Sequence, residues 1–175
     1  EDFYQAYLIK EFGFIEATTY IINHFSSRFS WLIVQLLNPL VYNFWIGVYI
    51  WPIIHIFLLI FTIFKLLRSI SSLSNKWLWL ISLWCTVIFL NEIPGIFEGI
   101  FWWSSAVMYL WGGLTTIIYL IALLKYLNNT LKYQFWLWVI PIIVLGFNEI
   151  FSVLLFEILL IAFGLQYSEN TKKQR

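Results

Sequence analysis

Long apolar stretches separated by short polar turns make up most of the chain. They predict five membrane-crossing helices, at about residues 40–64, 77–90, 103–124, 135–145 and 150–163. Some of these stretches are short for a hydrocarbon layer that takes about 20 residues, so we expect them to continue into the turns or to tilt. The pattern therefore predicts an all-α, polytopic membrane helix bundle.

The first 30 residues are too polar to cross a membrane. Residues 2–12 and 14–25 predict two short helices separated by Gly13. In the second helix, polar residues recur at four-residue spacing opposite an apolar side, so we expect it to lie along the membrane interface. The polar positions are Glu16, Tyr20 and His24. A break at Asn38-Pro39 precedes the first predicted span.

Composition supports the membrane assignment. The chain is 62% hydrophobic and 11% charged, with a mean hydropathy of +0.84, whereas soluble domains carry about 25% charged residues. The net charge of +1 gives no support for a nucleic-acid-binding surface. Met108 is the sole methionine, so the sequence does not begin at an initiator, and we expect it to be part of a longer protein.

The basic residues alternate between turns and predict an orientation. Eight of the ten lie in one set of turns: Lys65, Arg68, Lys76, Lys125, Lys132, Lys172, Lys173 and Arg175. Most acidic residues lie in the other set. Because basic residues favour the cytoplasmic side, residues 1–30, 91–101 and 146–149 are predicted to be extracytoplasmic. Residues 166–175 then form a cytoplasmic tail of a multi-pass membrane protein.

Acidic side chains on the predicted outer face are the candidate chemistry. Glu1, Asp2, Glu98 and Glu149 could take a proton from an acceptor hydroxyl, and Asp2 could hold a divalent metal ion through oxygen ligands. Glu149 also has a simpler explanation, since an acid in the first turn of a helix is stabilised by the helix dipole whatever the function. The other outer acids could be solvated loop charges. Glu157 lies inside the fifth span, where His55 is a candidate partner.

Other outer-face residues could bind a phosphorylated sugar. The guanidinium of Arg28 matches phosphate oxygens, and His24 lies nearby in the sequence. Trp102, Trp103 and Tyr109 offer flat faces for a sugar ring. The alternatives are an aromatic belt at the interface and, for Arg28, a side chain that extends to the interface from within the membrane.

Four sequence pieces resemble a family pattern. They are Glu1-Asp2 followed by an aromatic residue, Ser27-Arg28-Phe29, the set Glu98, Trp102, Trp103, Ser105 and Tyr109, and Gly146-Phe147-Asn148-Glu149. In this order they resemble an uncharacterised bacterial multi-pass family related to the GT-C glycosyltransferases, which use polyprenyl-phosphate-linked sugars. The third and fourth pieces are similar to the family's Glu, Trp, small-residue and Tyr spacing and to its Gly-x-Asn-Glu turn.

The resemblance implies a GT-C-like fold and a site. Asp2, supported by Glu1, would be the catalytic or metal-binding acid, and Arg28 would hold the carrier phosphate. The sugar or its acceptor would contact a further group: His24, Glu98, Trp102, Trp103, Tyr109, Asn148 and Glu149. The function expected is transfer of a sugar from a polyprenyl-phosphate carrier to an extracytoplasmic acceptor, with a divalent metal ion as a candidate cofactor. The alternative is a non-catalytic structural or transport subunit with membrane-protein partners.

Overall fold

The computed structural model describes residues 2–24, 28–93, 95–127 and 134–173, and every regular element in them is helical. The first half contains α1 (Asp2–His24), α2 (Phe29–Val34), the 3₁₀ turns η1 (Gln35–Leu37) and η2 (Pro39–Tyr42), α3 (Trp45–Ile70) and α4 (Asn75–Glu92). The second half contains the π-helical turn η3 (Phe97–Phe101), α5 (Trp103–Ala106), the π-helical turn η4 (Val107–Trp111), α6 (Gly112–Leu127), α7 (Gln134–Leu145) and α8 (Glu149–Lys173). The all-α class predicted from the sequence is confirmed for this part of the chain.

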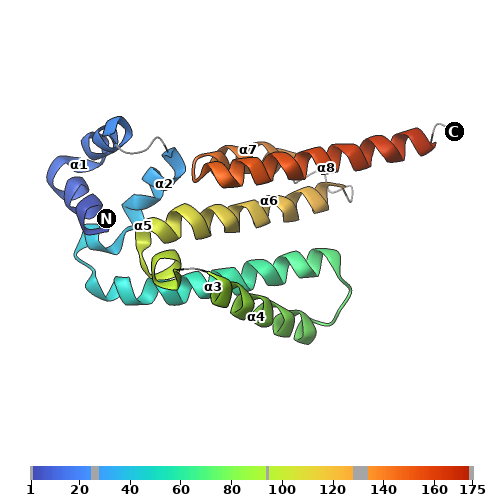
Figure 1. The fold of residues 1–175 in the computed structure, drawn as a ribbon, viewed down its shortest axis with the longest axis horizontal. Helices are drawn as coiled ribbons and strands as arrows, with labels where there is room; N and C mark the ends of the chain where they lie inside the picture. Colours follow the sequence, from blue (N-terminus) through green and yellow to red (C-terminus); the bar gives the residue numbers. More distant parts are fainter. Residues whose placement is uncertain (1, 25–27, 94, 128–133, 174–175) are drawn as a thin grey trace.

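The long helices lie side by side along the long axis of the molecule (Figure 1). α3 packs against α4 and α6, and α6 packs in turn against α7 and α8. α1, α2, the η3–α5 segment and the turn between α7 and α8 lie at one end of the bundle, whereas the α3–α4 turn and the C-terminus lie at the other (Figure 1). The three pieces that the basic-residue pattern assigns to one face therefore share one end.

Two helical stretches of the described chain are long and apolar enough to cross a membrane, judged by length and composition. They are Trp45–Ile70 and Trp103–Leu127, the latter running through α5, η4 and α6. Large apolar side chains also cover the outside of α3, α4, α7 and α8, for example Ile53, Trp84, Trp138 and Phe163. Soluble monomers rarely expose so continuous an apolar surface, and a surface that contacts lipid does so as a rule.

The structure corrects several predicted helix limits. α3 begins at Trp45 rather than near residue 40, because Pro39–Tyr42 form a 3₁₀ turn and Asn43 adopts a left-handed conformation with φ 57°. α4 covers 18 residues and extends past both ends of the short predicted span 77–90, into the turns where we expected that span to continue. The predicted cytoplasmic tail is helical as far as Lys173, because α8 continues without a break beyond the predicted end of the fifth span at residue 163.

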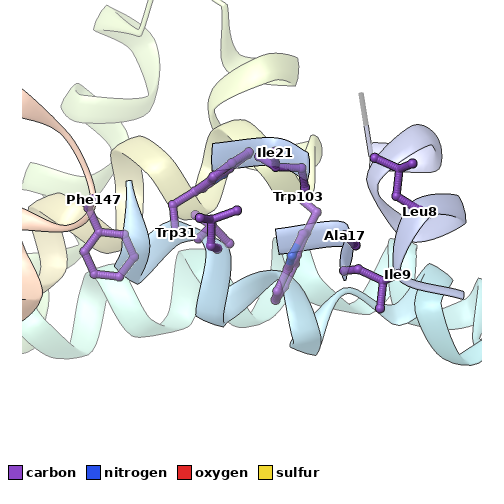
Figure 2. Close-up of a cluster of buried hydrophobic side chains, with 9 residues drawn as sticks. Leu8, Ile9, Ala17, Ile21, Trp31, Trp103 and Phe147 are labelled. Atoms are coloured by element: carbon purple, nitrogen blue, oxygen red, sulfur yellow. The ribbon is translucent and has the colours of Figure 1, made fainter. Parts of the chain in front are cut away.

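Gly13 divides α1 as the sequence predicts. Its backbone angles, φ 77° and ψ 164°, interrupt the helix where a side chain would be strained. Both halves of α1 bury apolar side chains against α2 and α5 in one core cluster (Figure 2). The cluster contains Leu8, Ile9, Ala17, Ile21, Trp31, Leu32, Trp103, Val107 and Phe147. This packing fixes α1 to the end of the bundle where the candidate site lies.

Candidate functional site at the α1 end of the bundle

The Asp2 carboxylate binds the start of α5. Its Oδ2 accepts a hydrogen bond from the Trp103 backbone N–H (2.7 Å) and its Oδ1 accepts one from Ser104 N–H (2.8 Å). These are N–H groups that a helix N-terminus leaves without an internal partner, and the positive end of the helix dipole favours a negative charge there. Asp2 therefore acts as an N-cap supplied from a distant part of the sequence, and it ties α1 to α5.

Ser104 connects this cap to its surroundings. Its carbonyl accepts a hydrogen bond from the indole N–H of Trp31 (2.9 Å), and its hydroxyl accepts one from Gln5 Nε2 (3.2 Å). On the other side, the backbone carbonyl of Asp2 accepts a hydrogen bond from Asn38 Nδ2 (3.3 Å). The position of the Asp2 carboxylate is thus set by α1, α2, α5 and the Asn38 turn together.

A cavity of about 360 Å³, named here the Asp2 cavity, opens beside this carboxylate. Its walls include Asp2, Asn38, Tyr49, Trp51, Trp102 and Trp103. Trp102 is half-exposed, whereas Trp103 is only 4% exposed and its indole nitrogen has no hydrogen-bond partner among the described residues. An ionised carboxylate accepts about four hydrogen bonds, and the backbone uses two of them, so Asp2 keeps acceptor capacity for a hydroxyl in the cavity.

Trp103 does not offer its ring faces to a ligand. Its ring lies 4.7 Å from that of Trp51 and 5.8 Å from that of His55, measured between centroids. Of the two tryptophans that were predicted to offer a flat face to a sugar, Trp102 is half-exposed and Trp103 is buried. The two tryptophans differ in their place relative to α5. The helix begins at Trp103, and its side chain lies in the core cluster shown in Figure 2.

His55 is a neutral packing residue. Its Nε2 accepts a hydrogen bond from the indole N–H of Trp111 (3.1 Å), and its Nδ1 lies 3.2 Å from the carbonyl oxygen of Ile100. An indole N–H only donates and a carbonyl only accepts, so the ring carries one proton, on Nδ1. Both ring nitrogens are used, and Glu157 is exposed on α8. The candidate His55–Glu157 pair is not formed.

Arg28 and Glu149 form a second group of site residues. Arg28 Nη2 and Nε donate to the two carboxylate oxygens of Glu149 at 2.7 and 3.3 Å, and Nη1 lies 2.9 Å from the sulfur of Met108. The hydrogen bond from Arg28 is the main reason why the pKa of Glu149 lies below its ordinary value of 4.5. The guanidinium that was predicted to hold a carrier phosphate is bound to a carboxylate of the same chain.

The Gly146–Glu149 turn joins α2 to α8. The carbonyl of Gly146 accepts hydrogen bonds from the backbone N–H groups of Ser30 (3.0 Å) and Trp31 (3.4 Å) at the start of α2. The side chain of Asn148 is buried, and its Oδ1 accepts the N–H of Ile150 in the first turn of α8 (3.0 Å). Asn148, which was predicted to contact the substrate, therefore caps the N-terminus of α8.

Glu98 and Tyr109 lie at a separate cavity. This cavity of about 380 Å³, named here the Glu98 cavity, is lined by residues of α4, η3, η4 and α8 together with Gly95 and Ser105. No residue is common to the two cavities, although Phe101–Trp103 line one of them and Ile100 and Ser105 the other. The η3–α5 segment therefore separates them.

The structure thus divides the predicted site into three groups at one end of the bundle. They are Asp2 with Trp102 and Trp103, Arg28 with Glu149, and Glu98 with Tyr109. His24 joins none of them; its ring stacks on Tyr20 at 4.4 Å and its Nδ1 lies 2.9 Å from the Tyr20 carbonyl. Glu1 lies outside the described residues. Sequence reasoning missed Asn38, Tyr49 and Trp51, of which only Asn38, beside Pro39, had given a local signal.

No group of three or more His, Cys, Asp or Glu side chains in the described ranges lies close enough together to hold a metal ion. No protein-family model matches the chain, and comparison with curated proteins and with solved structures gives no match either.

Proposed function

We propose that the chain is a multi-pass membrane protein that binds a lipid-linked sugar at the Asp2 cavity and transfers the sugar to an extracytoplasmic acceptor. The observation that carries the proposal is the Asp2 carboxylate, held by two backbone N–H groups beside an exposed tryptophan in the wall of a 360 Å³ cavity. Carboxylates and aromatic rings are the side chains that bind sugar hydroxyls and sugar faces. The resemblance to GT-C-related proteins points to the same class of reaction.

In the proposed reaction an acceptor oxygen forms a bond to the anomeric carbon of the sugar. The bond between that carbon and the carrier phosphate breaks, and the phosphate leaves with the electron pair. Asp2 takes or orients the proton of the acceptor hydroxyl, using the acceptor positions that the backbone leaves open. Trp102, whose ring is half-exposed in the cavity wall, stacks on a sugar ring.

The phosphate and the metal ion have defined places in this proposal. Arg28 lies at the same end of the bundle as Asp2, and it would exchange Glu149 for the carrier phosphate, since a guanidinium binds either group in a bidentate way. A divalent cation would be held by Asp2 and by phosphate oxygens of the donor, because oxygen ligands suit such ions. The donor sugar is attached to a lipid, so the long helices would present the cavity near the membrane surface.

The test is a transfer assay with the full chain in liposomes that contain a polyprenyl-phosphate-linked sugar. We expect Asp2→Asn to lower the rate by about a hundredfold or more, the usual contribution of a positioned acid or base. Trp102→Ala should lower it by about tenfold, the effect of losing about 1.4 kcal/mol of binding. Trp138→Ala is the matched control, because that tryptophan is 74% exposed on α7 and does not line the cavity.

Stability measurements separate a catalytic Asp2 from a structural one. Asp2→Asn keeps one acceptor oxygen for the α5 amides, whereas Asp2→Ala keeps none, so Asp2→Ala should unfold more easily by about 1 kcal/mol. If Asp2 is catalytic, both variants lose activity equally despite this difference. Activity that instead falls in proportion to stability, or that survives Asp2→Asn, removes Asp2 from the mechanism.

A non-catalytic subunit of a membrane complex is the second candidate. The observation in its favour is that Arg28 is bound by Glu149 and that Glu98 and Asp2 line two separate cavities. In that case the acidic residues serve to hold helices together. Wild-type chain that shows no transfer with any polyprenyl-phosphate donor, but co-purifies with one fixed membrane-protein partner, would favour this function.

A further inference from the structure

The Glu98 cavity brings three polar groups together with aromatic rings. Glu98, Ser105 and Tyr109 line it, and none of their side chains makes a hydrogen bond to another described residue. Phe89 of α4 and Phe151 of α8 line it as well, and no described residue of the lining is basic. The cavity therefore offers one carboxylate, two hydroxyl groups and three aromatic rings to a ligand.

Two rare backbone features shape this cavity. η3 contributes Glu98 and Ile100, η4 contributes Tyr109 and Leu110, and both turns are π-helical. π-Helical turns make up well under 1% of residues in proteins and occur often at functional sites. The two turns also contact one another. A pair of such turns that supplies two of the three polar groups of a single cavity, Glu98 and Tyr109, is a second indication that the cavity binds a ligand.

Charge and hydrogen-bonding capacity define the ligand. A carboxylate without a basic neighbour attracts a cation, and aromatic rings stabilise an ammonium group placed over their faces. A primary ammonium has three N–H donors, which match the three acceptors Glu98, Ser105 and Tyr109. Apolar groups of Ile93, Leu110 and Phe151 lie in the same lining and suit an acyl chain.

We infer that the Glu98 cavity binds the primary ammonium head of a membrane amphiphile such as an ethanolamine-headed lipid. This site is distinct from the Asp2 cavity and does not depend on the proposed sugar transfer. Its ligand is recognised by the Glu98 carboxylate and the aromatic rings, and Ser105 and Tyr109 accept the remaining N–H groups.

The test is native mass spectrometry of the full chain, freed of lipid in detergent and mixed with lipids of identical acyl chains. Ethanolamine-headed, choline-headed and glycerol-headed lipids are compared, since only the first brings both a positive charge and three N–H donors. We expect five- to tenfold more bound ethanolamine lipid, about the factor that 1–1.4 kcal/mol gives. Glu98→Gln should reduce its binding to the level of the other two.

Glu92→Gln is the matched control. Glu92 is an exposed acid at the end of α4, only six positions before Glu98, and it does not line the cavity. The variant should keep the full preference for the ethanolamine head. Equal binding of the three lipids by the wild-type chain would overturn the inference, and so would a preference that Glu98→Gln leaves intact. Neither result bears on Asp2, whose role is decided by the transfer assay.

Discussion

At the scale of single residues, the two best-placed acids both act on helix N-termini. Asp2 binds the first amides of α5 through its side chain, and Glu149 is itself the first residue of α8. Both positions are favoured by the helix dipole. The helix-terminus explanation that the sequence left open for Glu149 is therefore present in the molecule, and the structure adds the same explanation for Asp2. The catalytic explanation for Asp2 rests on the acceptor capacity that remains and on the cavity beside it.

The Arg28–Glu149 pair makes a pH-dependent contribution to stability. Arg28 lowers the pKa of Glu149 in the folded protein below 4.5, so the unfolded chain binds a proton more readily. The pair's contribution is therefore complete above pH 4.5 and is lost as the pH falls through the lower, folded-state pKa. We expect Glu149→Gln to lower Tm at pH 7 and to have a smaller effect at pH 3 than at pH 7. Because Glu149 is 75% exposed, the effect at pH 7 should be small.

The measurement is thermal unfolding of both proteins in detergent between pH 7 and pH 3. Glu92→Gln is again a suitable control, since Glu92 has no ion pair among the described residues. A Tm difference for Glu149→Gln that stays constant over this range would contradict the ion pair. A difference that grows as the pH falls would contradict the sign of the pKa shift.

At the scale of elements, the helices could be predicted from the sequence, but the contacts between helices could not. The apolar pattern and Gly13 predicted helices close to those observed, because helix periodicity and glycine breaks are local properties. Contacts such as Arg28 with Glu149, 121 positions apart, depend on how helices pack. The predicted helix limits were wrong where a local turn was not recognised. At Asn43, for example, a left-handed conformation ends the 3₁₀ turn before α3.

Gly146 shows how closely two elements depend on one residue. A Cβ at this position would lie 2.7 Å from the Phe29 ring and would also clash with the Ser30 hydroxyl, so α2 could not approach the turn. We expect Gly146→Ala to destabilise the protein by about 1–3 kcal/mol, the usual cost of overpacking. Gly164→Ala is the control, because a Cβ there meets nothing within 4 Å and alanine favours a helix by about 1 kcal/mol.

Denaturant unfolding of the two variants measures both effects. Gly146→Ala should also weaken the Arg28–Glu149 contact, because Ser30 and Arg28 are joined to the same turn. Equal stability of Gly146→Ala and wild type would show that α2 does not pack on this turn as described. A loss of stability in Gly164→Ala would show that position 164 is not an unpacked position of a helix.

At the scale of the whole molecule, the alternation of charge agrees with the arrangement of the helices. Arg68 lies in the last turn of α3 and Lys125 in the last turn of α6, at the end opposite α1. The sequence could predict this separation because each helix reverses the direction of the chain. It could not predict that the acids at the α1 end would fall into separate groups, since that depends on which side of the η3–α5 segment each residue occupies.

α4 decides whether the proposed multi-pass topology holds. It is not one of the two helices that qualify as spans by length and composition, yet its 18 residues extend about 27 Å, close to the thickness of the hydrocarbon layer. In a Cys85→Ser background we expect Glu92→Cys to react with a membrane-impermeant maleimide from outside only. Ser72→Cys, across α4, and Leu127→Cys, at the same end as Ser72, should react from inside only. Labelling of positions 72 and 92 from the same side would mean that α4 does not cross, and the charge alternation would then have no bearing on orientation.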